Sequence, residues 1–380
     1  MRITLMLLMI LAAAGATAEP RARDLGVPFD GEPGPLNAIT DVAGLTVGHA
    51  TVIEDFANGH KARTGVTAIL PRGRADIRTP VFGGWFSLNG NGEMTGTTWL
   101  EESGLLDGPV MITNTHSVGI VRDAVIGWRV RQGGADASGY WWSLPVVAET
   151  WDGHLNDANG FHVTAAHAGT ALDSAVGGPV TEGNVGGGTG MICHEFKCGI
   201  GTSSRRVAIE GRALTVGVLV QANYGLRESL RIAGVPIGQH LREQRAYQDQ
   251  PGETGSIIIV VATDAPLLPH QLKRLARRAS LGLGRMGSYA GNGSGDIFIA
   301  FSTANKAVHG GAAFVNAEYL ENGHMDPLFE ATVQATEEAI VNALVAARDM
   351  EGEGGRWAKA LPHAELVALL KRYGRLTTPR

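Results

Sequence analysis

A glycine–serine pair stands directly before a deeply apolar segment of the sequence. Gly255 and Ser256 precede residues 257–262, which are all apolar. If the chain were cut between the two, Ser256 would carry both a nucleophilic hydroxyl and a free α-amine. An α-amine has a pKa of about 7.7–8.0 and accepts a proton near neutral pH, whereas the amide nitrogen of an uncut chain cannot. The pair therefore suggests self-processing to an N-terminal serine nucleophile.

By itself this dipeptide is a weak motif. Gly-Ser also occurs at 287–288 and 293–294, and it is ordinary turn chemistry. Glycine at 255 favours processing, because it tolerates the strained geometry in which a hydroxyl attacks the preceding carbonyl. No serine has glycine at both −2 and +2, so the nucleophile elbow is missing. Residues 282–287 fit G-x-G-x-x-G but follow a predicted helix rather than a strand, which argues against a dinucleotide site.

The two cysteines, Cys193 and Cys198, lie on either side of a short segment that contains His194. They could pair in an oxidising compartment, but two cysteines do not make a disulfide framework. A metal site is a second alternative, although three ligands within six residues lack the usual paired spacing. We therefore expect buried or free thiols and no metal site.

The first 18 residues have the pattern of a secretory signal. Arg2 precedes the mostly apolar segment 3–11, and small residues follow up to Ala18, where an A-x-A site ends. A membrane anchor is the competing interpretation, but the apolar stretch is shorter than the roughly 20 residues that a spanning helix needs. We expect cleavage after Ala18 and, in a bacterium-like cell, a periplasmic protein.

The composition indicates a folded chain with no nucleic-acid partner. Hydrophobic residues make up 44% and charged residues 18% of the 380 positions, which excludes a disordered chain. The formal charge of −5 provides no basic footprint for nucleic acid. The 53 glycines are roughly twice the usual share and lie between apolar runs. They indicate turns and close backbone approaches in a compact, loop-rich fold.

The elements that must position these residues alternate between strands and helices. Apolar or β-branched runs predict strands at 45–47, 66–70, 110–113, 207–209, 214–222, 257–262 and 297–301, the last two buried on both faces. Helical periodicity predicts helices at 119–131, 226–233, 269–282, 327–348 and 362–373. Residues 19–37 read as an extended arm and 244–254 as an exposed loop. With no low-complexity linker between the halves, we expect one catalytic domain over 19–380.

Five further motifs make the chain recognisable. They are ITDVAGL at 39–45, LNGNGEMTG at 88–96, LND at 155–157, GNVGGGTGM at 183–191 and GNGSGD at 291–296. With them, nearly the whole mature chain resembles the self-processing serine aminopeptidases that include the L-aminopeptidase/D-amidase/D-esterase and the β-peptidyl aminopeptidases. The resemblance implies an α+β fold, a four-layer αββα sandwich, and self-cleavage into chains 19–255 and 256–380.

The resemblance also implies roles for three residues of the second chain. Ser256 matches the nucleophile that cleavage frees. Ser294 matches a second serine that hydrogen-bonds the nucleophile, and Asp296 matches the acidic residue behind it. In this family that acid can be a glutamate, so the reach of the shorter Asp296 carboxylate is open at this point.

Three residues of the first chain match substrate-contacting positions. Asn223 follows the apolar run 214–222, where a side-chain amide can donate to a developing oxyanion; a strand-end turn is the alternative. Glu149 matches the carboxylate that would bind the ammonium of the substrate, with a surface glutamate as the alternative. Trp151 stands where relatives often carry a tyrosine, so any role of that hydroxyl is missing here.

The implied enzyme releases N-terminal residues from short peptides, amides or esters without a metal or organic cofactor. Relatives assemble as homo-oligomers, often tetramers, and no membrane partner is expected after signal removal. Three alternatives stay open: β-peptidyl aminopeptidase specificity, an acyltransferase related to ornithine acetyltransferase, and a periplasmic binding protein in which Gly255–Ser256 is only a turn. Serine rather than threonine at 256, together with the signal sequence, counts against the acyltransferase.

Overall fold

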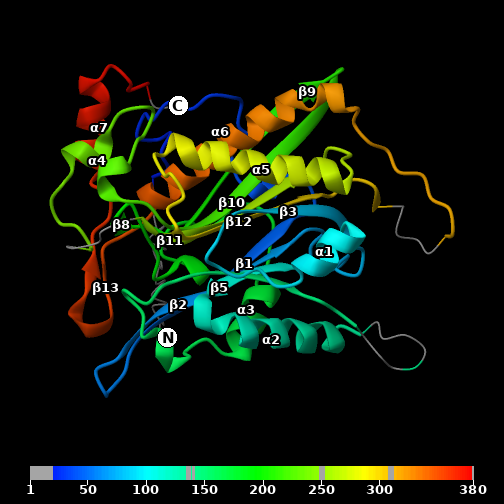
Figure 1. The fold of residues 1–380 in the computed structure, drawn as a ribbon, viewed down its shortest axis with the longest axis horizontal. Coiled ribbons are helices and arrows are strands. Elements are labelled where there is room, and N and C mark those ends of the chain that lie inside the picture. Colours follow the sequence, from blue (N-terminus) through cyan, green and yellow to red (C-terminus); the bar gives the residue numbers. More distant parts are fainter. Residues whose placement is uncertain (1–19, 134–137, 139–141, 248–252, 307–311, 379–380) are drawn as a thin grey trace, which may run out of the picture.

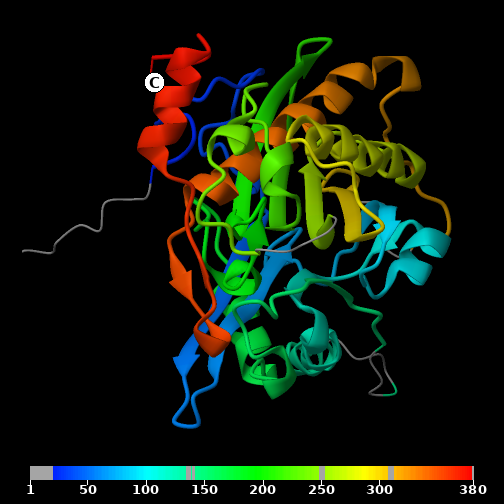
Figure 2. The same ribbon diagram turned by 60° about the vertical axis from the view of Figure 1, so that its left-hand side comes forward.

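The computed structural model describes residues 20–133, 138, 142–247, 253–306 and 312–378. The segment predicted to be a signal peptide, 1–18, lies outside the described residues. Two β-sheets lie face to face between two layers of helices (Figures 1 and 2). This is the four-layer αββα sandwich that the resemblance implies. Within the described part of the chain, no helix is long and apolar enough to span a membrane.

The larger sheet carries the central strands of the molecule. Its order is β4-β3-β12-β11-β10-β9, and only β11 and β12 run parallel. The strand bounds are β3 Val81–Gly90, β4 Leu105–Leu106, β9 Ile200–Ile209, β10 Arg212–Asn223, β11 Thr254–Thr263 and β12 Gly293–Ser302. The smaller sheet has the order β1-β2-β5-β6, with bounds Thr46–Asp55, Lys61–Leu70, Val110–Asn114 and Val146–Thr150.

Helices cover the outer face of each sheet. Helices α5 (Pro269–Arg285) and α6 (Asp326–Val345) pack on the larger sheet, whereas α2 (Val118–Arg131) and α3 (Ala165–Asp173) pack on the smaller one. Along β11, Ile257 and Ile259 face the helices, while Ile258 and Val260 face the other sheet. The prediction of a strand buried on both faces is therefore confirmed, and the apolar layer between the sheets explains it.

The remaining elements are short. They are the helices α1 (Thr97–Ser103), α4 (Ile237–His240) and α7 (His363–Arg372) and the hairpins β7–β8 (Ile192–Cys193, Phe196–Lys197) and β13–β14 (Met350–Glu351, Trp357–Ala358). The helix predicted at 226–233 is wrong, because only Arg227–Ser229 forms a 3-10 turn. Positive φ angles at Ala233 and Gly234 reverse the chain there. The other four predicted helices are present as α2, α5, α6 and α7.

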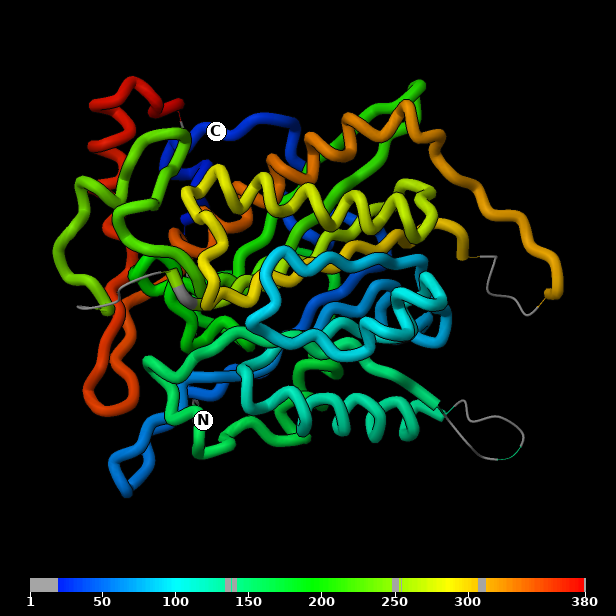
Figure 3. The backbone as a smooth tube through the Cα atoms, viewed as in Figure 1, coloured from blue at the N-terminus to red at the C-terminus, as the bar shows by residue number. Residues whose placement is uncertain are grey.

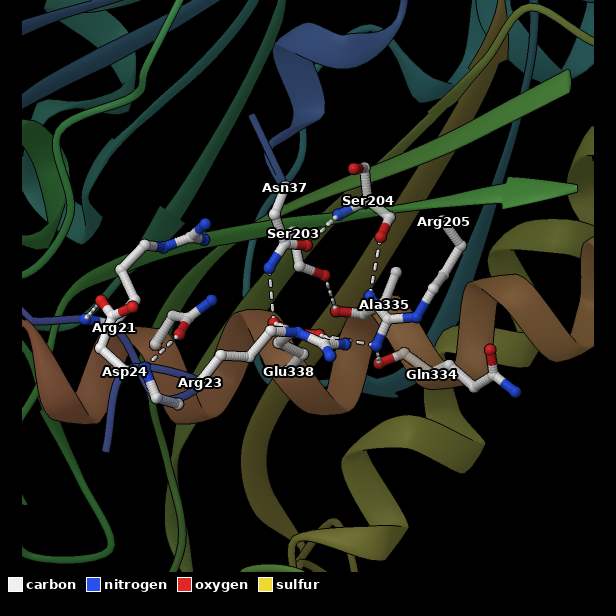
Figure 4. A network of polar contacts seen from close by, with 12 residues as sticks. Arg21, Arg23, Asp24, Asn37, Ser203, Ser204, Arg205, Gln334, Ala335 and Glu338 are labelled. Carbon is white, nitrogen blue, oxygen red and sulfur yellow. Dashed lines mark hydrogen bonds and ion pairs between the residues drawn. The ribbon is translucent and has the colours of Figure 1, made fainter. Parts of the chain in front are cut away.

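A buried ion cluster fastens the N-terminal arm to the body (Figure 4). Arg23 makes two hydrogen bonds of 2.7 Å to the Glu338 carboxylate on α6, and Asn37 donates to the same group. Arg205 on β9 completes the cluster with a 2.7 Å ion pair to Glu338. The C-terminal segment also lies beside the arm, where the Thr377 N–H donates to the Gly26 carbonyl (Figure 3). The predicted arm is therefore a docked part of the domain.

Candidate active site

A cavity of about 1000 Å³ opens at one end of the larger sheet. Its walls come from segments that lie far apart in the sequence and meet around the start of β11. The lining residues that the argument uses are Glu149, Trp151, Ile192, Asn223, Gly255 and Ser256. Four residues that the sequence predicts for the site therefore line one cavity together with the predicted cleavage point. Glu149 and Trp151, Asn223, and the Gly255–Ser256 pair come from three separate segments of the chain.

Ser256 lies at the N-terminal end of β11. This strand pairs with β10, which carries Asn223, and with β12, which carries Ser294. In the sheet register Ser256 is opposite Asn223 of β10 and Gly295 of β12. Ser256 is only 3% exposed. The preceding Gly255 has φ 130°, and a Cβ there would lie 2.2 Å from the Asn223 carbonyl oxygen. Only glycine fits this position.

Ser294 and Asp296 lie directly behind Ser256 on β12. The Ser294 hydroxyl donates to the Asp296 Oδ1 at 2.8 Å, and both residues are fully buried. The aspartate carboxylate therefore does reach the second serine, which answers the question of its length. Burial raises the pKa of Asp296 to about 6, while the Ser294 hydrogen bond opposes the shift and the nearby Glu253 adds to it.

The raised pKa of Asp296 predicts a pH-dependent stability. The folded pKa of about 6 lies above the usual aspartate value of 3.8, so stability falls as pH rises from about 4 to about 6 and then stays level. Asp296→Asn removes this dependence while it keeps an acceptor for Ser294. The variant should gain about 2 kcal/mol relative to its parent between pH 4 and pH 7.5. Urea unfolding of both proteins in a Ser256→Ala background measures this, and an equal difference at both pH values would contradict it.

Asn223 ends β10 with its amide held in one orientation. The Ile192 N–H donates to the Asn223 Oδ1 at 2.9 Å. Because a backbone N–H can only donate, the amide must turn its oxygen toward Ile192 and its NH₂ group away from it. Asn223 is 4% exposed and lines the cavity beside Ser256. Asn223 therefore brings an N–H donor group to the cavity that Ser256 lines, and oxyanion holes use donors of this kind.

Glu149, near the end of β6, places a buried carboxylate in the same cavity. Its Oε1 accepts from the Glu93 N–H at 3.0 Å, and its Oε2 accepts from the Thr115 hydroxyl. Burial raises its pKa, whereas these hydrogen bonds lower it. Glu149 is 3% exposed, so the alternative of an ordinary surface glutamate is wrong. A carboxylate with little water around it suits the binding of an ammonium group.

Aromatic side chains form much of the remaining wall. Trp151 is 45% exposed at the cavity, while Tyr224 and the edge-to-face pair His154–Tyr247 complete the surface. Sequence reasoning missed Thr115, Tyr224 and Tyr247, because nothing in their local patterns indicates that the fold brings them together. Tyr247 belongs to the loop predicted at 244–254, of which residues 248–252 lie outside the described residues. That loop is not exposed throughout, since Glu253 is buried.

The cysteines differ from the expectation. Cys193 and Cys198 are both buried, as expected, but they form a disulfide and are not free thiols. The β7–β8 hairpin between them brings their side chains together, which the five-residue separation alone left open. In the described part of the chain, no group of three or more His, Cys, Asp or Glu side chains is arranged to hold a metal ion.

Comparison with known proteins agrees with this architecture. The sequence profile of peptidase family S58 matches residues 37–358. The chain belongs to this family. It is 55% identical over 392 residues to the β-peptidyl aminopeptidase BapA of Sphingosinicella microcystinivorans, covering 98% of this chain and 97% of the relative.

Two solved structures share both fold and sequence with this S58 peptidase. The L-aminopeptidase D-Ala-esterase/amidase of Ochrobactrum anthropi, described as a variant of the Ntn hydrolase fold, superimposes with a TM-score of 0.89. It is 52% identical, over 94% of this chain and all of the other. A β-aminopeptidase of a Burkholderia species gives a TM-score of 0.86 at 50% identity, over 93% and 99% of the chains. The protein is therefore a serine aminopeptidase, and its fold is the one that the resemblance implies.

Proposed function

We propose that this S58 aminopeptidase cuts its own chain between Gly255 and Ser256, and that the freed Ser256 hydrolyses N-terminal residues from short peptides. The observation that carries the proposal is the meeting of Ser256, Asn223 and Glu149 in one cavity. The positive φ of Gly255 supports it, because a glycine tolerates the geometry in which a hydroxyl attacks the preceding carbonyl. The Ser256 hydroxyl attacks the Gly255 carbonyl and displaces the Ser256 nitrogen, which takes up the proton and becomes the free α-amine. Water then hydrolyses the resulting ester to the Gly255 carboxylate and the Ser256 hydroxyl, which separates the two chains.

In the processed enzyme, the groups divide the work of acyl transfer. The Ser256 hydroxyl attacks the substrate carbonyl, and its own α-amine takes the proton and passes it to the leaving amine. The Asn223 NH₂ donates to the oxyanion. Ser294, held by Asp296, lies beside the nucleophile on the neighbouring strand and orients the new N-terminus. Water then attacks the acyl-enzyme and restores Ser256.

For substrate class, we propose that the cavity accepts β-amino acyl groups as well as α-amino acyl groups. Support comes from the names of the relatives, one a β-peptidyl aminopeptidase, one a β-aminopeptidase and one an L-aminopeptidase. The roughly 1000 Å³ cavity also has room for one more methylene. Turnover of L-, D- and β-aminoacyl p-nitroanilides measures the preference. A second experiment adds ornithine to the enzyme and an aminoacyl ester. A hydrolase should release the free acid, whereas an acyltransferase should form acylornithine.

Location and assembly complete the proposal. Residues 1–18 would direct export to a periplasm, and the Cys193–Cys198 disulfide supports an oxidising compartment. The mature enzyme would be a homo-oligomer. N-terminal sequencing of exported protein should begin at Glu19, and light scattering of the purified enzyme gives the number of subunits.

Glu149→Gln should raise KM for aminopeptidase substrates by about 10- to 100-fold, with a much smaller change in kcat. The variant keeps the size of the side chain but removes the charge that binds the ammonium, and a charge-assisted hydrogen bond contributes about 1.5–3 kcal/mol. Steady-state kinetics on an aminoacyl p-nitroanilide measures both constants. The matched control is Glu93→Gln, an exposed glutamate at the same cavity. An unchanged KM in Glu149→Gln, or an equal rise in the control, would assign ammonium binding elsewhere.

A further inference from the structure

A buried hairpin closed by the disulfide lies directly against the candidate oxyanion donor. Strands β7 and β8 pair over two residues each, and a disulfide joins Cys193 of β7 to Cys198, the residue after β8. Every residue from 191 to 200 is buried. Ile192, the first residue of β7, also lines the catalytic cavity. The hairpin, residues 192–198, is therefore part of the cavity wall rather than a distant surface feature.

Two hydrogen bonds connect this hairpin to the end of β10. The Ile192 N–H donates to the Asn223 Oδ1 at 2.9 Å, and the His194 N–H donates to the Tyr224 carbonyl at 2.7 Å. The first bond fixes the rotation of the Asn223 amide, and the second fixes the backbone that follows it. The direction of the Asn223 NH₂ group therefore depends on where the hairpin lies.

The hairpin has a turn that its residues do not favour. His194 and Glu195 have φ angles of 48° and 61°, the conformation of a two-residue turn that usually requires asparagine or glycine. Neither residue is of these types, so other contacts must hold the turn. The Arg227 guanidinium donates to both turn carbonyls, at 2.9 Å and 2.7 Å. The Cys193–Cys198 disulfide holds the two strands of the hairpin together.

The buried side chain of Lys197 links the residue that precedes β7 to the residue that follows β8. Its Nζ donates to the carbonyls of Met191 at 2.8 Å and Cys198 at 2.6 Å. No carboxylate among the described residues pairs with it, and burial lowers its pKa well below the usual value. The two carbonyls therefore accept two of the N–H bonds of this amine. Lys197 thus links the residue before Ile192 to the second cysteine.

We propose that the disulfide-closed hairpin positions the oxyanion donor, with Cys193, Cys198 and Lys197 as positioning residues for Asn223. The inference rests on the role proposed for Asn223. Opening the bond to two thiols, with two electrons and two protons supplied by an added reductant, releases the strained turn on one side. The Ile192 N–H then no longer holds the Asn223 amide, so transition-state stabilisation falls while ground-state substrate binding is kept.

The test uses the processed enzyme and the double variant Cys193→Ala/Cys198→Ala. We expect kcat to fall about tenfold, a part of the 10²–10³ that loss of an oxyanion donor causes, with KM within threefold. Affinity for an aminoalkyl boronic acid, which forms a tetrahedral adduct with serine, should fall by the same factor. Inhibition by the free amino acid product should not change. Hydrogen exchange at the Ile192 amide should become faster.

Two controls isolate the hairpin. A phosphine reductant should reproduce the loss in the unmodified enzyme and have no effect on the double variant. Lys359→Ala removes an exposed side chain next to β8. The backbone carbonyl of residue 359, which accepts from the backbone N–H of Lys197, is retained, so the variant should have normal kinetics. If the double variant does not fold, the reductant on the unmodified enzyme gives the same readouts.

Several outcomes would overturn the inference. Unchanged kcat and boronic acid affinity after the bond is opened would do so, as would a rise in KM alone. Unchanged exchange at the Ile192 amide would also overturn it, and this readout does not need turnover. An intact enzyme that hydrolyses no aminoacyl substrate contradicts the proposed function instead, so the two failures are distinguishable.

Discussion

Ser256→Ala should yield a single uncut chain with no aminopeptidase turnover. The substitution removes the hydroxyl that attacks the Gly255 carbonyl, and it also removes the nucleophile of the mature enzyme. The expected loss of kcat is on the order of 10⁶-fold, comparable with the loss of a serine nucleophile in other hydrolases. Denaturing mass spectrometry should find chains 19–255 and 256–380 in the parent protein and one chain in the variant.

A matched control keeps this result specific. Ser280 lies on the exposed side of α5, where its hydroxyl donates to the Arg277 carbonyl, so Ser280→Ala should be processed and active like the parent. Turnover that survives in Ser256→Ala would remove Ser256 from the mechanism. An active parent that stays a single chain would remove the α-amine, since the Ser256 nitrogen would still be an amide. An inactive, uncut parent would support the binding-protein alternative.

Asn223→Ala should lower kcat by about 10²- to 10³-fold with little change in KM. One preorganised N–H donor to an oxyanion contributes about 2.7–4 kcal/mol to transition-state stabilisation, and the donor does not contact the ground-state substrate equally well. The measurement is steady-state kinetics on processed protein, with the fraction of cut chain determined first. A normal kcat would show that Asn223 is only a strand-end residue.

Asn223→Asp separates orientation from donation. The aspartate can still accept from the Ile192 N–H, so the contact that holds the side chain is kept. It has no N–H to donate, and its negative charge would face the oxyanion. The loss in kcat should therefore be at least as large as that of Asn223→Ala. If Asn223→Asp retained activity, the side chain would act through its contact with Ile192 alone.

Local sequence patterns predicted secondary structure correctly where every residue of a segment has the same surroundings. Residues 257–262 are apolar at every position, and this alone predicts a strand between two apolar layers, as β11 is. They failed where packing overrides propensity. Strand β3 contains Gly83 and Gly84, and glycines do not indicate a strand. A Cβ at Gly84 would lie 2.5 Å from the backbone nitrogen of Lys273 on α5. The glycine is needed for the close approach of helix and sheet.

The sequence by itself determined the presence of a Gly-Ser junction at the head of a buried strand, and its motifs indicated the family. The cavity was decided only by the tertiary structure, because Asn223, Ser256 and Ser294 meet through pairing of β10, β11 and β12. The disulfide was decided in the same way, by a hairpin that brings two cysteines together. Pairing between distant strands depends on the packing of the whole sandwich, and no local spacing along the chain contains that information.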